Sequence, residues 1–353
     1  MPKRELKCFQ AINEAIDLCM AKDPSVYIVG LGVPDPKGVF GTTLGLQEKY
    51  GDLRVMDMPT SENGMTGVAI GSALVGMRPI MTHQRLDFAL LAIEQIVNQA
   101  AKWHYMFGGR MSVPLVIRMI IGRGWGQGPQ HSQSLQSWFA HVPGLKVVMP
   151  TTPYDAKGLL IASIEDNNPV IFLEHRWLHG ITGHVPEGVF RVPIGQARIV
   201  REGSDLTIAA MSHMTLEALR AAEILAKENI SAEVIDIRTL RPLDEGLILG
   251  SVRKTGRLIV ADTGWKTAGF GAEVVARAAE GAFSALKSPP ARVALPDCPT
   301  PTSPALAKDY FPRAVHLVAT AKKMLGLCMD ARELSSFATP PLDVPDMSFT
   351  GPF

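Results

Sequence analysis

The chain contains the apolar run Val113-Pro-Leu-Val-Ile117 and, soon after it, the segment Gly122-Arg-Gly-Trp-Gly-Gln-Gly-Pro-Gln-His131-Ser-Gln133. The run is short and rich in branched apolar side chains, which predicts a buried strand. The segment after it is dense in glycine, which predicts a loop. Ligands of open α/β sheets bind beyond the carboxyl ends of the strands, so we expect this loop to border a binding site.

Similar apolar runs recur on both sides of this strand and alternate with helical patterns. The runs are Val26–Val29, Val55–Met58, Met77–Met81, Leu145–Met149 and Val170–Leu173. Apolar residues at helical spacing lie in Arg4–Met20, Gly64–Val75, Phe88–Trp103 and Pro153–Glu165. Alternation of this kind predicts a parallel sheet that is covered by helices on both faces.

The second half of the chain repeats the alternation on a smaller scale. Strands are predicted at Leu206–Met211, Ala232–Ile237, Arg257–Ala261 and Ala291–Leu295, and helices at Thr215–Glu228, Glu245–Lys254, Gly271–Leu286 and Arg313–Leu325. We therefore predict two doubly wound, mainly parallel α/β domains in series, residues 1–185 and 201–326, joined by a linker at 186–200. Residues 327–353 are rich in Pro, Ser, Asp and Phe, which predicts a tail that is disordered or extended along a neighbouring subunit.

Composition narrows the class of protein. The 353 residues are 46% hydrophobic and 20% charged, a balance that allows a sizeable core. The formal net charge is only +1, which disfavours nucleic acid as a partner. No apolar run is long enough to span a bilayer and the four cysteines form no C-x-x-C pair, so we expect a cytoplasmic protein without a membrane role or disulfide framework.

One candidate for chemistry is Pro59-Thr-Ser-Glu62-Asn-Gly64, which opens a glycine-rich helix after a strand. Thr60 or Ser61 could cap this helix, and a carboxylate in the first turn is favoured by the helix dipole. On the residues alone, this capping interpretation of Glu62 is preferred. The glycines that follow allow close approach of another backbone or of a flat ligand, but by themselves they are better explained by close helix packing.

A second candidate is His131, which the glycine-dense loop would deliver to the mouth of the sheet. An imidazole titrates near neutral pH and can exchange protons there. The loop lacks the G-K-[ST] ending of a phosphate-binding loop. Three further histidines, His175, His179 and His184, have spacing that could recruit a metal, but intervening glycines disfavour the helix that such a site would need.

Several motifs in the same order resemble one known family. They are Gly41-Thr-Thr-Leu-Gly-Leu-Gln-Glu-Lys-Tyr-Gly51, Ser61-Glu62-Asn-Gly64, Ile93-Glu-Gln-Ile-Val-Asn98, Gln130-His-Ser-Gln133, Pro143-Gly-Leu-Lys-Val-Val148, Asp166-Asn-Asn-Pro-Val170, Asp236-Ile-Arg-Thr-Leu-Arg-Pro-Leu-Asp244 and Gly264-Trp-Lys-Thr-Ala-Gly-Phe-Gly-Ala-Glu273. From about residue 7 to about residue 325, the chain resembles the beta subunit of the thiamine diphosphate-dependent 2-oxo acid dehydrogenases. This transketolase-like family implies a pyrimidine-binding domain followed by a transketolase C-terminal-like domain.

The resemblance implies roles for particular residues. Glu62 matches the glutamate that hydrogen-bonds the aminopyrimidine ring of the cofactor, so that the exocyclic amine can act as a base. Phe88 matches the aromatic residue on the pyrimidine face, and His131 matches the histidine that approaches the substrate. A potassium site built largely from backbone carbonyls is implied at Leu115, Ser163, Ile164, Asp166 and Asn168.

The resemblance also implies partners. Enzymes of this class hold the diphosphate through Mg²⁺ bound at a G-D-G motif, and no G-D-G occurs in this sequence. An alpha subunit would therefore complete the site and bring Mg²⁺ in an α2β2 heterotetramer. The second domain, by the same resemblance, would support beta–beta pairing and could dock on a lipoyl-bearing acyltransferase core.

The implied activity is oxidative decarboxylation of a small 2-oxo acid, with acyl transfer to a lipoyl group. The alternatives are the beta subunit of an acetoin dehydrogenase and half of a split transketolase-like transferase. A non-catalytic assembly subunit is disfavoured because Glu62 and His131 are both present. The polar stretch Thr82–Asp87 departs from the more aromatic family pattern, so His83 or Arg85 could face a polar or anionic substrate, or lie at the surface or a subunit contact.

Overall fold

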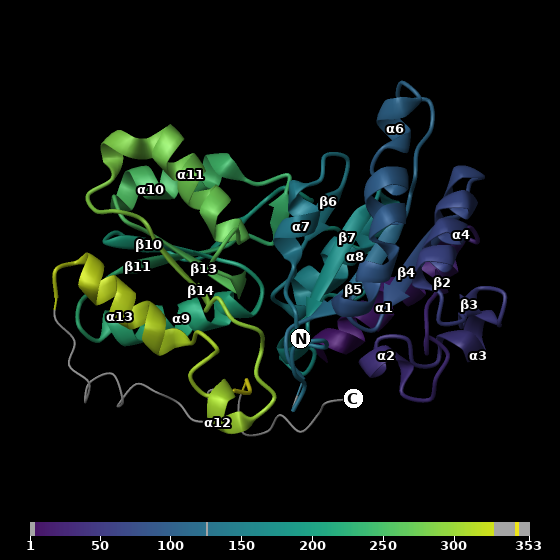
Figure 1. Cartoon of the computed structure of the whole chain (residues 1–353), viewed down its shortest axis with the longest axis horizontal. Coiled ribbons are helices and arrows are strands. Elements are labelled where there is room, and N and C mark those ends of the chain that lie inside the picture. Colours follow the sequence, from purple (N-terminus) through teal and green to yellow (C-terminus); the bar gives the residue numbers. More distant parts are fainter. Residues whose placement is uncertain (1–3, 125, 328–342, 346–353) are drawn as a thin grey trace.

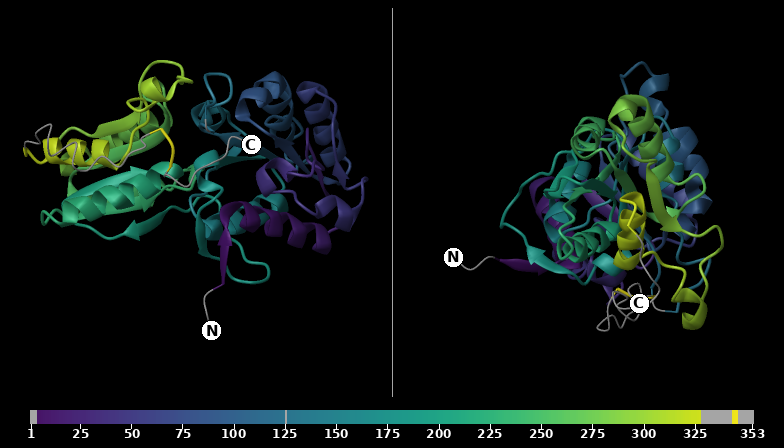
Figure 2. Two further views of the ribbon diagram at one scale, coloured as in Figure 1. Left: turned by 90° about the horizontal axis from the view of Figure 1, so that it is seen from below. Right: turned by 90° about the vertical axis from the view of Figure 1, so that its left-hand side faces the viewer.

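Two sheets, each covered by helices on both faces, lie side by side (Figure 1) in a computed structural model that describes residues 4–124, 126–327 and 343–345. The view from below also separates the two domains (Figure 2). The prediction of two mainly parallel α/β domains is confirmed. Within the described part of the chain, none of the helices combines the length and apolarity needed to cross a bilayer.

The first domain is built on a seven-stranded sheet with the order β12-β6-β7-β5-β4-β2-β3. Its strands are β2 (Val26–Val29), β3 (Val55–Met56), β4 (Arg78–His83), β5 (Val116–Ile121), β6 (Lys146–Val148), β7 (Val170–His175) and β12 (Thr239–Arg241). All neighbours are parallel except β12, which is antiparallel to β6. A small antiparallel pair, β1 (Glu5–Lys7) with β8 (Thr182–His184), lies apart from this sheet.

Helices cover both faces of the first sheet because the side chains of its strands alternate between two apolar cores. In β5, Ile117 and Met119 belong to one core and Val116 and Ile120 to the other. The first core is closed by α4 (Glu62–Leu74), α5 (Leu86–Ala89), η1 (Leu90–Ala92) and η2 (Gln95–Ala100), and the second by α1 (Cys8–Lys22) and α8 (Pro153–Glu165). The central strands are therefore buried on both sides.

The second domain has a five-stranded sheet with the order β14-β13-β10-β11-β9. The strands are β9 (Arg198–Arg201), β10 (Leu206–Ala210), β11 (Ala232–Asp236), β13 (Leu258–Trp265) and β14 (Ala291–Leu295), and only β9 is antiparallel. The helices are α9 (His213–Ala226) and α13 (Ala314–Met324) on one face, and α10 (Glu245–Thr255) and α11 (Phe270–Ala282) on the other.

Local sequence explains where several elements begin and end. The side chain of Thr152 accepts a hydrogen bond from the backbone N–H of Asp155, and Pro153 follows at the first helical position of α8. The strand predicted from Val113 begins only at Val116, because Pro114 has no N–H to donate to a neighbouring strand. The helix predicted over Phe88–Trp103 is helical but irregular, since it passes through a 3₁₀ turn at η1 and a π-helical segment at η2.

The two domains are joined by more than the chain that connects them. Strand β12 follows β11 in sequence, yet it pairs with β6 and completes the first sheet. A buried polar group lies at the same boundary, where the hydroxyl of Thr151 donates to Asp236 at 3.0 Å. The sequence patterns did not predict this strand.

Stability should depend on pH through Asp236. Burial, and next the charge of Asp155, raise the pKa of this carboxyl from 3.8 to about 7. The folded protein therefore keeps a proton that the unfolded chain loses above pH 4, so this contribution to stability falls as pH rises through about 7. Asparagine does not titrate, so the melting temperature of Asp236→Asn minus that of the unchanged protein should increase as the pH is raised from 5 to 8. A difference independent of pH would contradict this, and Asp17→Asn beside Lys49 is the surface control.

Candidate active site

Glu62 is the first residue of α4, directly after the short strand β3 and its connecting loop. Its side chain is only 6% exposed, unusual burial for a carboxylate. Ser61 occupies the capping position, but its hydroxyl makes no capping hydrogen bond, so the predicted Ser61 cap is wrong. Instead, Ser61 Oγ lies 2.9 Å from where a Cβ of Gly64 would stand, so glycine makes room for it.

Phe88 and His131 are brought together from distant parts of the sequence. Their ring centroids are 5.3 Å apart and the rings meet edge to face at 87°. The loop that carries His131 is fixed here by Gln133, whose amide donates to the carboxylate of Asp87 at 2.8 Å. His131 itself remains exposed. Since α4 packs against α5 and η2, the helix of Glu62 adjoins the helix of Phe88.

A buried ion pair links Arg118, in the middle of β5, to Glu174, near the carboxyl end of β7. Arg118 donates to Glu174 through two hydrogen bonds of 2.7 and 3.0 Å, and both side chains are 1% exposed. His179 approaches the same carboxylate at 3.2 Å. Burial alone would raise the pKa of Glu174, but the charge of Arg118 and the contact with His179 hold this pKa below its ordinary value. The carboxylate is therefore charged and holds the two neighbouring strands together.

The turn that starts the His131 loop requires glycine. Gly122 has a φ of +74°, and a Cβ on it would lie 2.5 Å from Nε2 of His175. Arg85 anchors the same turn, because it donates to the carbonyl of Gly122 at 2.8 Å and to the side chain of Gln127. The loop is thus tied at its start by Arg85 and at its end by Asp87.

Known proteins with similar sequences decide the family. Over 91% of this chain and 98% of its own length, the beta subunit of acetoin:2,6-dichlorophenolindophenol oxidoreductase from Cupriavidus necator is 47% identical. The mitochondrial pyruvate dehydrogenase E1 component subunit beta-2 of Oryza sativa is 44% identical over 91% of this chain and 86% of its own. The chain is a beta subunit of the 2-oxo acid dehydrogenase family. This beta subunit is therefore a component of an oxidoreductase, as the sequence predicted.

The domain models agree with this family, and a solved structure shares the fold. Residues 4–180 of the beta subunit match the transketolase pyrimidine binding domain, and residues 195–317 match the transketolase C-terminal domain. A solved structure described as a split gene transketolase, inactive beta4 tetramer, is similar in fold, with a TM-score of 0.75 and 24% identity. The structural match covers 91% of this chain and 99% of the chain in the solved structure.

His83 and Arg85 of the beta subunit are buried, each only 2% exposed, so the alternative that they are surface residues is wrong. Burial lowers the pKa of His83 to about 4, which leaves the imidazole neutral, and neither ring nitrogen has a partner among the described residues. Arg85 is occupied with Gly122 and Gln127 and stacks over Phe40 at 5.5 Å. Its contacts therefore support the loop and offer no open cationic surface to a substrate.

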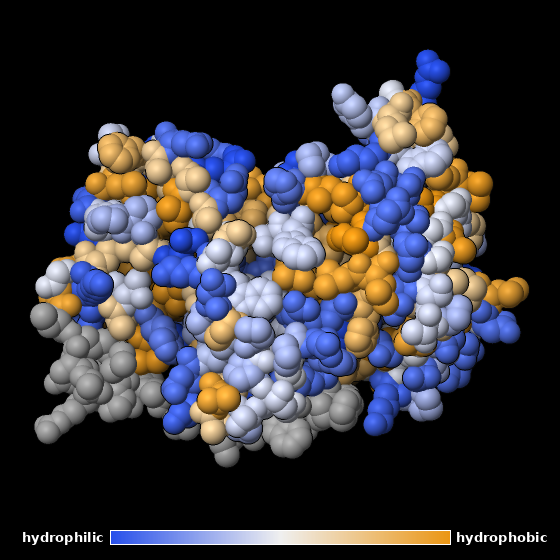
Figure 3. Space-filling model, viewed as in Figure 1, coloured by the Kyte–Doolittle hydropathy of each residue, from blue (hydrophilic) through white to orange (hydrophobic). Residues whose placement is uncertain are grey.

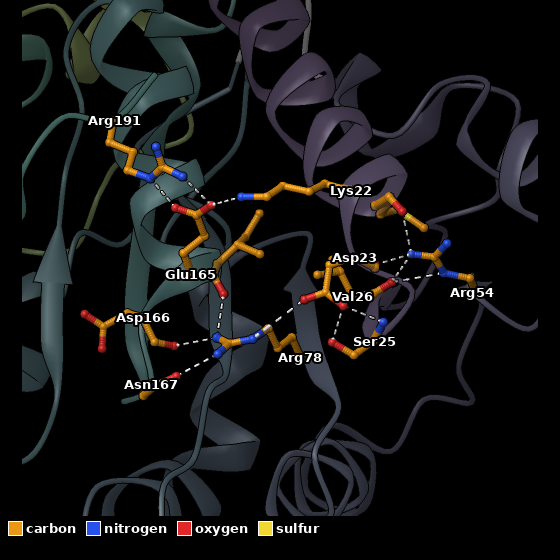
Figure 4. A network of polar contacts seen from close by, with 12 residues as sticks. Lys22, Asp23, Ser25, Val26, Arg54, Arg78, Glu165, Asp166, Asn167 and Arg191 are labelled. Atoms are coloured by element: carbon orange, nitrogen blue, oxygen red, sulfur yellow. Dashed lines mark hydrogen bonds and ion pairs between the residues drawn. The ribbon is translucent and has the colours of Figure 1, made fainter. Parts of the chain in front are cut away.

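The residues predicted to bind potassium lie where strands β5 and β7 begin, at the end of the first sheet away from the loop of His131. The carbonyl oxygens of Ile164 and Asp166 each accept a hydrogen bond of 3.1 Å from Arg78, and Asn167 accepts another through its side chain (Figure 4). The carbonyl of Leu115 accepts from Val170 at 2.9 Å. The remaining two positions, Ser163 and Asn168, belong to the same corner. Among the described residues, no cluster of His, Cys, Asp and Glu could hold a metal ion.

Sequence reasoning missed the residues that support the site. Arg118 and Glu174 were not singled out, although each is a charged residue directly after an apolar run, Val113–Ile117 and Val170–Leu173. Asp87 was noted only as part of the unusual stretch before Phe88. Gln133 stood inside a quoted motif, which was the available signal for its contact with Asp87.

Proposed function

We propose that this beta subunit supplies half of a thiamine diphosphate site in an enzyme that oxidatively decarboxylates a small 2-oxo acid and passes the acyl group to a lipoyl group. The observation that carries the proposal is a buried carboxylate, Glu62, at the start of α4, a helix that packs against α5, where Phe88 meets His131. Thiamine diphosphate, when bound, supplies a carbon nucleophile and an acceptor for the electrons released from the substrate.

The residues present suit the pyrimidine half of that cofactor. The carboxylate of Glu62 would share a proton with a ring nitrogen, and its burial makes such a charge-assisted hydrogen bond stronger than in water. The half-buried ring of Phe88 offers a flat apolar surface for the pyrimidine face. His131, exposed and held edge-on to Phe88, would move a proton to or from the substrate.

The other half of the site would come from an alpha subunit, which would bind the diphosphate and Mg²⁺. The absence of G-D-G from the sequence supports this division. One face of α4 is exposed and made of small or apolar residues, namely Gly64, Val68 and Gly71, and Val75 continues it just after the helix. Apolar side chains gather near α4 and α6 (Trp103–Met106) on the surface (Figure 3). Such an exposed surface suits a subunit contact in an α2β2 assembly.

Two finer features extend the proposal. A potassium ion at the carbonyls of Leu115, Ser163, Ile164, Asp166 and Asn168 would stiffen the amino edge of the sheet, where each carbonyl has a second lone pair beyond those used by Arg78 and Val170. A lipoyl acyltransferase core would dock on the second domain, and the assembly would be cytoplasmic.

Acetoin is the second candidate substrate. The acetoin relative is slightly more similar to this chain, at 47% identity, than the pyruvate dehydrogenase relative, at 44%. The same grouping of Glu62, Phe88 and His131 would serve either reaction, because both begin at a carbonyl carbon. The release of carbon dioxide distinguishes them.

The proposal is tested with the beta subunit assembled with its alpha subunit, using a dye as electron acceptor. Pyruvate, branched 2-oxo acids, acetoin and sugar phosphates are compared. We expect dye reduction with release of carbon dioxide from a 2-oxo acid; reduction with acetoin alone would select the second candidate, and reaction with sugar phosphates alone would contradict both. The isolated beta subunit is the control, and tight binding of thiamine diphosphate and Mg²⁺ by it would refute the division of the site.

A further inference from the structure

Three residues near the carboxyl terminus, Asp343, Val344 and Pro345, lie against the body of the same chain. Val344 is only 7% exposed, so its apolar side chain is buried although it belongs to a polar, proline-rich tail. Its backbone and that of Pro345 are held by Arg313, which precedes α13 in the second domain and donates to the two carbonyls at 2.8 and 3.1 Å. The three residues are therefore a docked segment of the tail.

The same segment reaches the loop of His131. Arg123, the second residue of that loop, approaches Asp343 with Nη1 at 3.5 Å from the carboxylate. The Arg123 side chain is 1% exposed. Among the described residues, Asp343 is the carboxylate that forms an ion pair with it. A buried guanidinium without a counter-charge is strongly disfavoured, so Asp343 stabilises the buried position of Arg123.

The loop is also bound to the second domain beside this contact. Nη2 of Arg123 donates to the carbonyl of Thr302 at 2.9 Å. Gly128 packs so closely on the Thr302 hydroxyl that a Cβ there would clash. The ring of Phe311 lies under the Arg123 guanidinium at 5.8 Å. Arg123 is thus the point where the loop, the second domain and the tail meet.

We propose that Asp343, Val344 and Pro345 form an internal clasp that fixes the loop of His131, residues 122–124 and 126–133, against the second domain. Arg123 is the positioning residue through which the clasp acts. The loop is tied to the first domain by Arg85 and Asp87, and the clasp reinforces the contacts that Arg123 and Gly128 make with Thr302 of the second domain. The claim about the loop stands independently of the reaction, whereas its effect on turnover rests on the proposed function.

The clasp is tested by trypsin cleavage after Arg123, because a buried arginine is cut only when its segment opens locally. In the full chain, Asp343→Ala is expected to raise the rate of this cleavage about tenfold or more, and hydrogen exchange of residues 126–133 should rise with it. Asp343→Glu, which restores the charge, should keep the loop protected. Asp17→Ala removes an ion pair between α1 and α3 (Leu46–Tyr50), with Lys49, in which no residue of the loop takes part, and is the matched control.

Two results would overturn the clasp. One is unchanged cleavage and exchange in Asp343→Ala. The other is an equal rise in cleavage after Lys157, fully buried in α8, which would mean that the whole fold had loosened. These measurements need no substrate, so they decide on the clasp even if the proposed function fails.

A double-mutant cycle tests whether Asp343 acts through Arg123. Hydrogen exchange of the loop is compared in Arg123→Met, Asp343→Ala and the double variant. We expect Asp343→Ala to raise the exchange of the loop little further once Arg123 is replaced, since both substitutions remove the contact between Arg123 and Asp343. Additive effects on exchange would contradict the role of Arg123. In the assembled enzyme, Asp343→Ala should lower kcat several-fold with little change in KM for the cofactor, and Asp343→Glu should restore it.

Discussion

Glu62→Gln is expected to lower the turnover of the assembled enzyme by about 100- to 10,000-fold, the usual contribution of a positioned acid or base. The amide has nearly the shape of the carboxylate and still makes a hydrogen bond, so the burial of the side chain and much of the cofactor binding should be retained. What is lost is the ability to share a proton with the cofactor ring. The measurement is kcat, together with the dissociation constant for thiamine diphosphate.

The matched control is Glu48→Gln, which removes one negative charge from an exposed position on α3 (Leu46–Tyr50). This variant should keep full turnover. If Glu62→Gln were as active as Glu48→Gln, the proton role would be excluded, and the preferred role of Glu62 would return to that of a charge at the start of α4.

Glu174→Gln is expected to lower the free energy of unfolding by about 3–5 kcal/mol, since it leaves the buried Arg118 without a charged partner. The change in unfolding free energy is measured by denaturant titration of the full chain. A loss much smaller than this would mean that water reaches the Arg118 guanidinium and replaces the carboxylate.

The chain offers a close control for this prediction. Arg277 and Glu273 form a pair with the same Nε to Oε1 distance of 2.7 Å, but their side chains are 42% and 50% exposed. Glu273→Gln should change stability by about 0.5 kcal/mol or less, because an exposed pair is solvated in both states. Replacing both buried partners, as in Arg118→Met with Glu174→Leu, should recover part of the loss.

The strands of this protein could be predicted because most of them are buried on both faces and are therefore continuous apolar runs. Strand β12 could not, because Thr239-Leu-Arg241 carries no such run and its pairing with β6 depends on the approach of two domains. The start of β5 at Val116, later than predicted, could not be read from the sequence for a different reason. The apolar run includes Pro114, and only the missing N–H of that residue excludes its first part from the sheet.

The site followed from family resemblance more than from residue patterns. Glu62 on its own is most simply a carboxylate at a helix start, and no local pattern reports that it is buried. The meeting of Phe88 and His131 joins a residue of α5 to a residue of a distant loop, and the Arg118 to Glu174 pair joins two strands. Contacts of this kind depend on the register of the whole sheet. The burial of Arg85 was unpredictable for the same reason, since its acceptors lie on the loop after β5.

Strand β12, which follows β11 of the second domain in sequence, forms one edge of the first sheet. This limits where recombination could exchange one domain for that of a related protein. A fragment that ended within the predicted linker, residues 186–200, would lack β12 and leave β6 as an open edge. The free amides and carbonyls of such an edge recruit strands from other chains. Recombination at that linker would therefore yield an aggregation-prone protein. The two domains are expected to be inherited as a single unit, even though each has its own sheet.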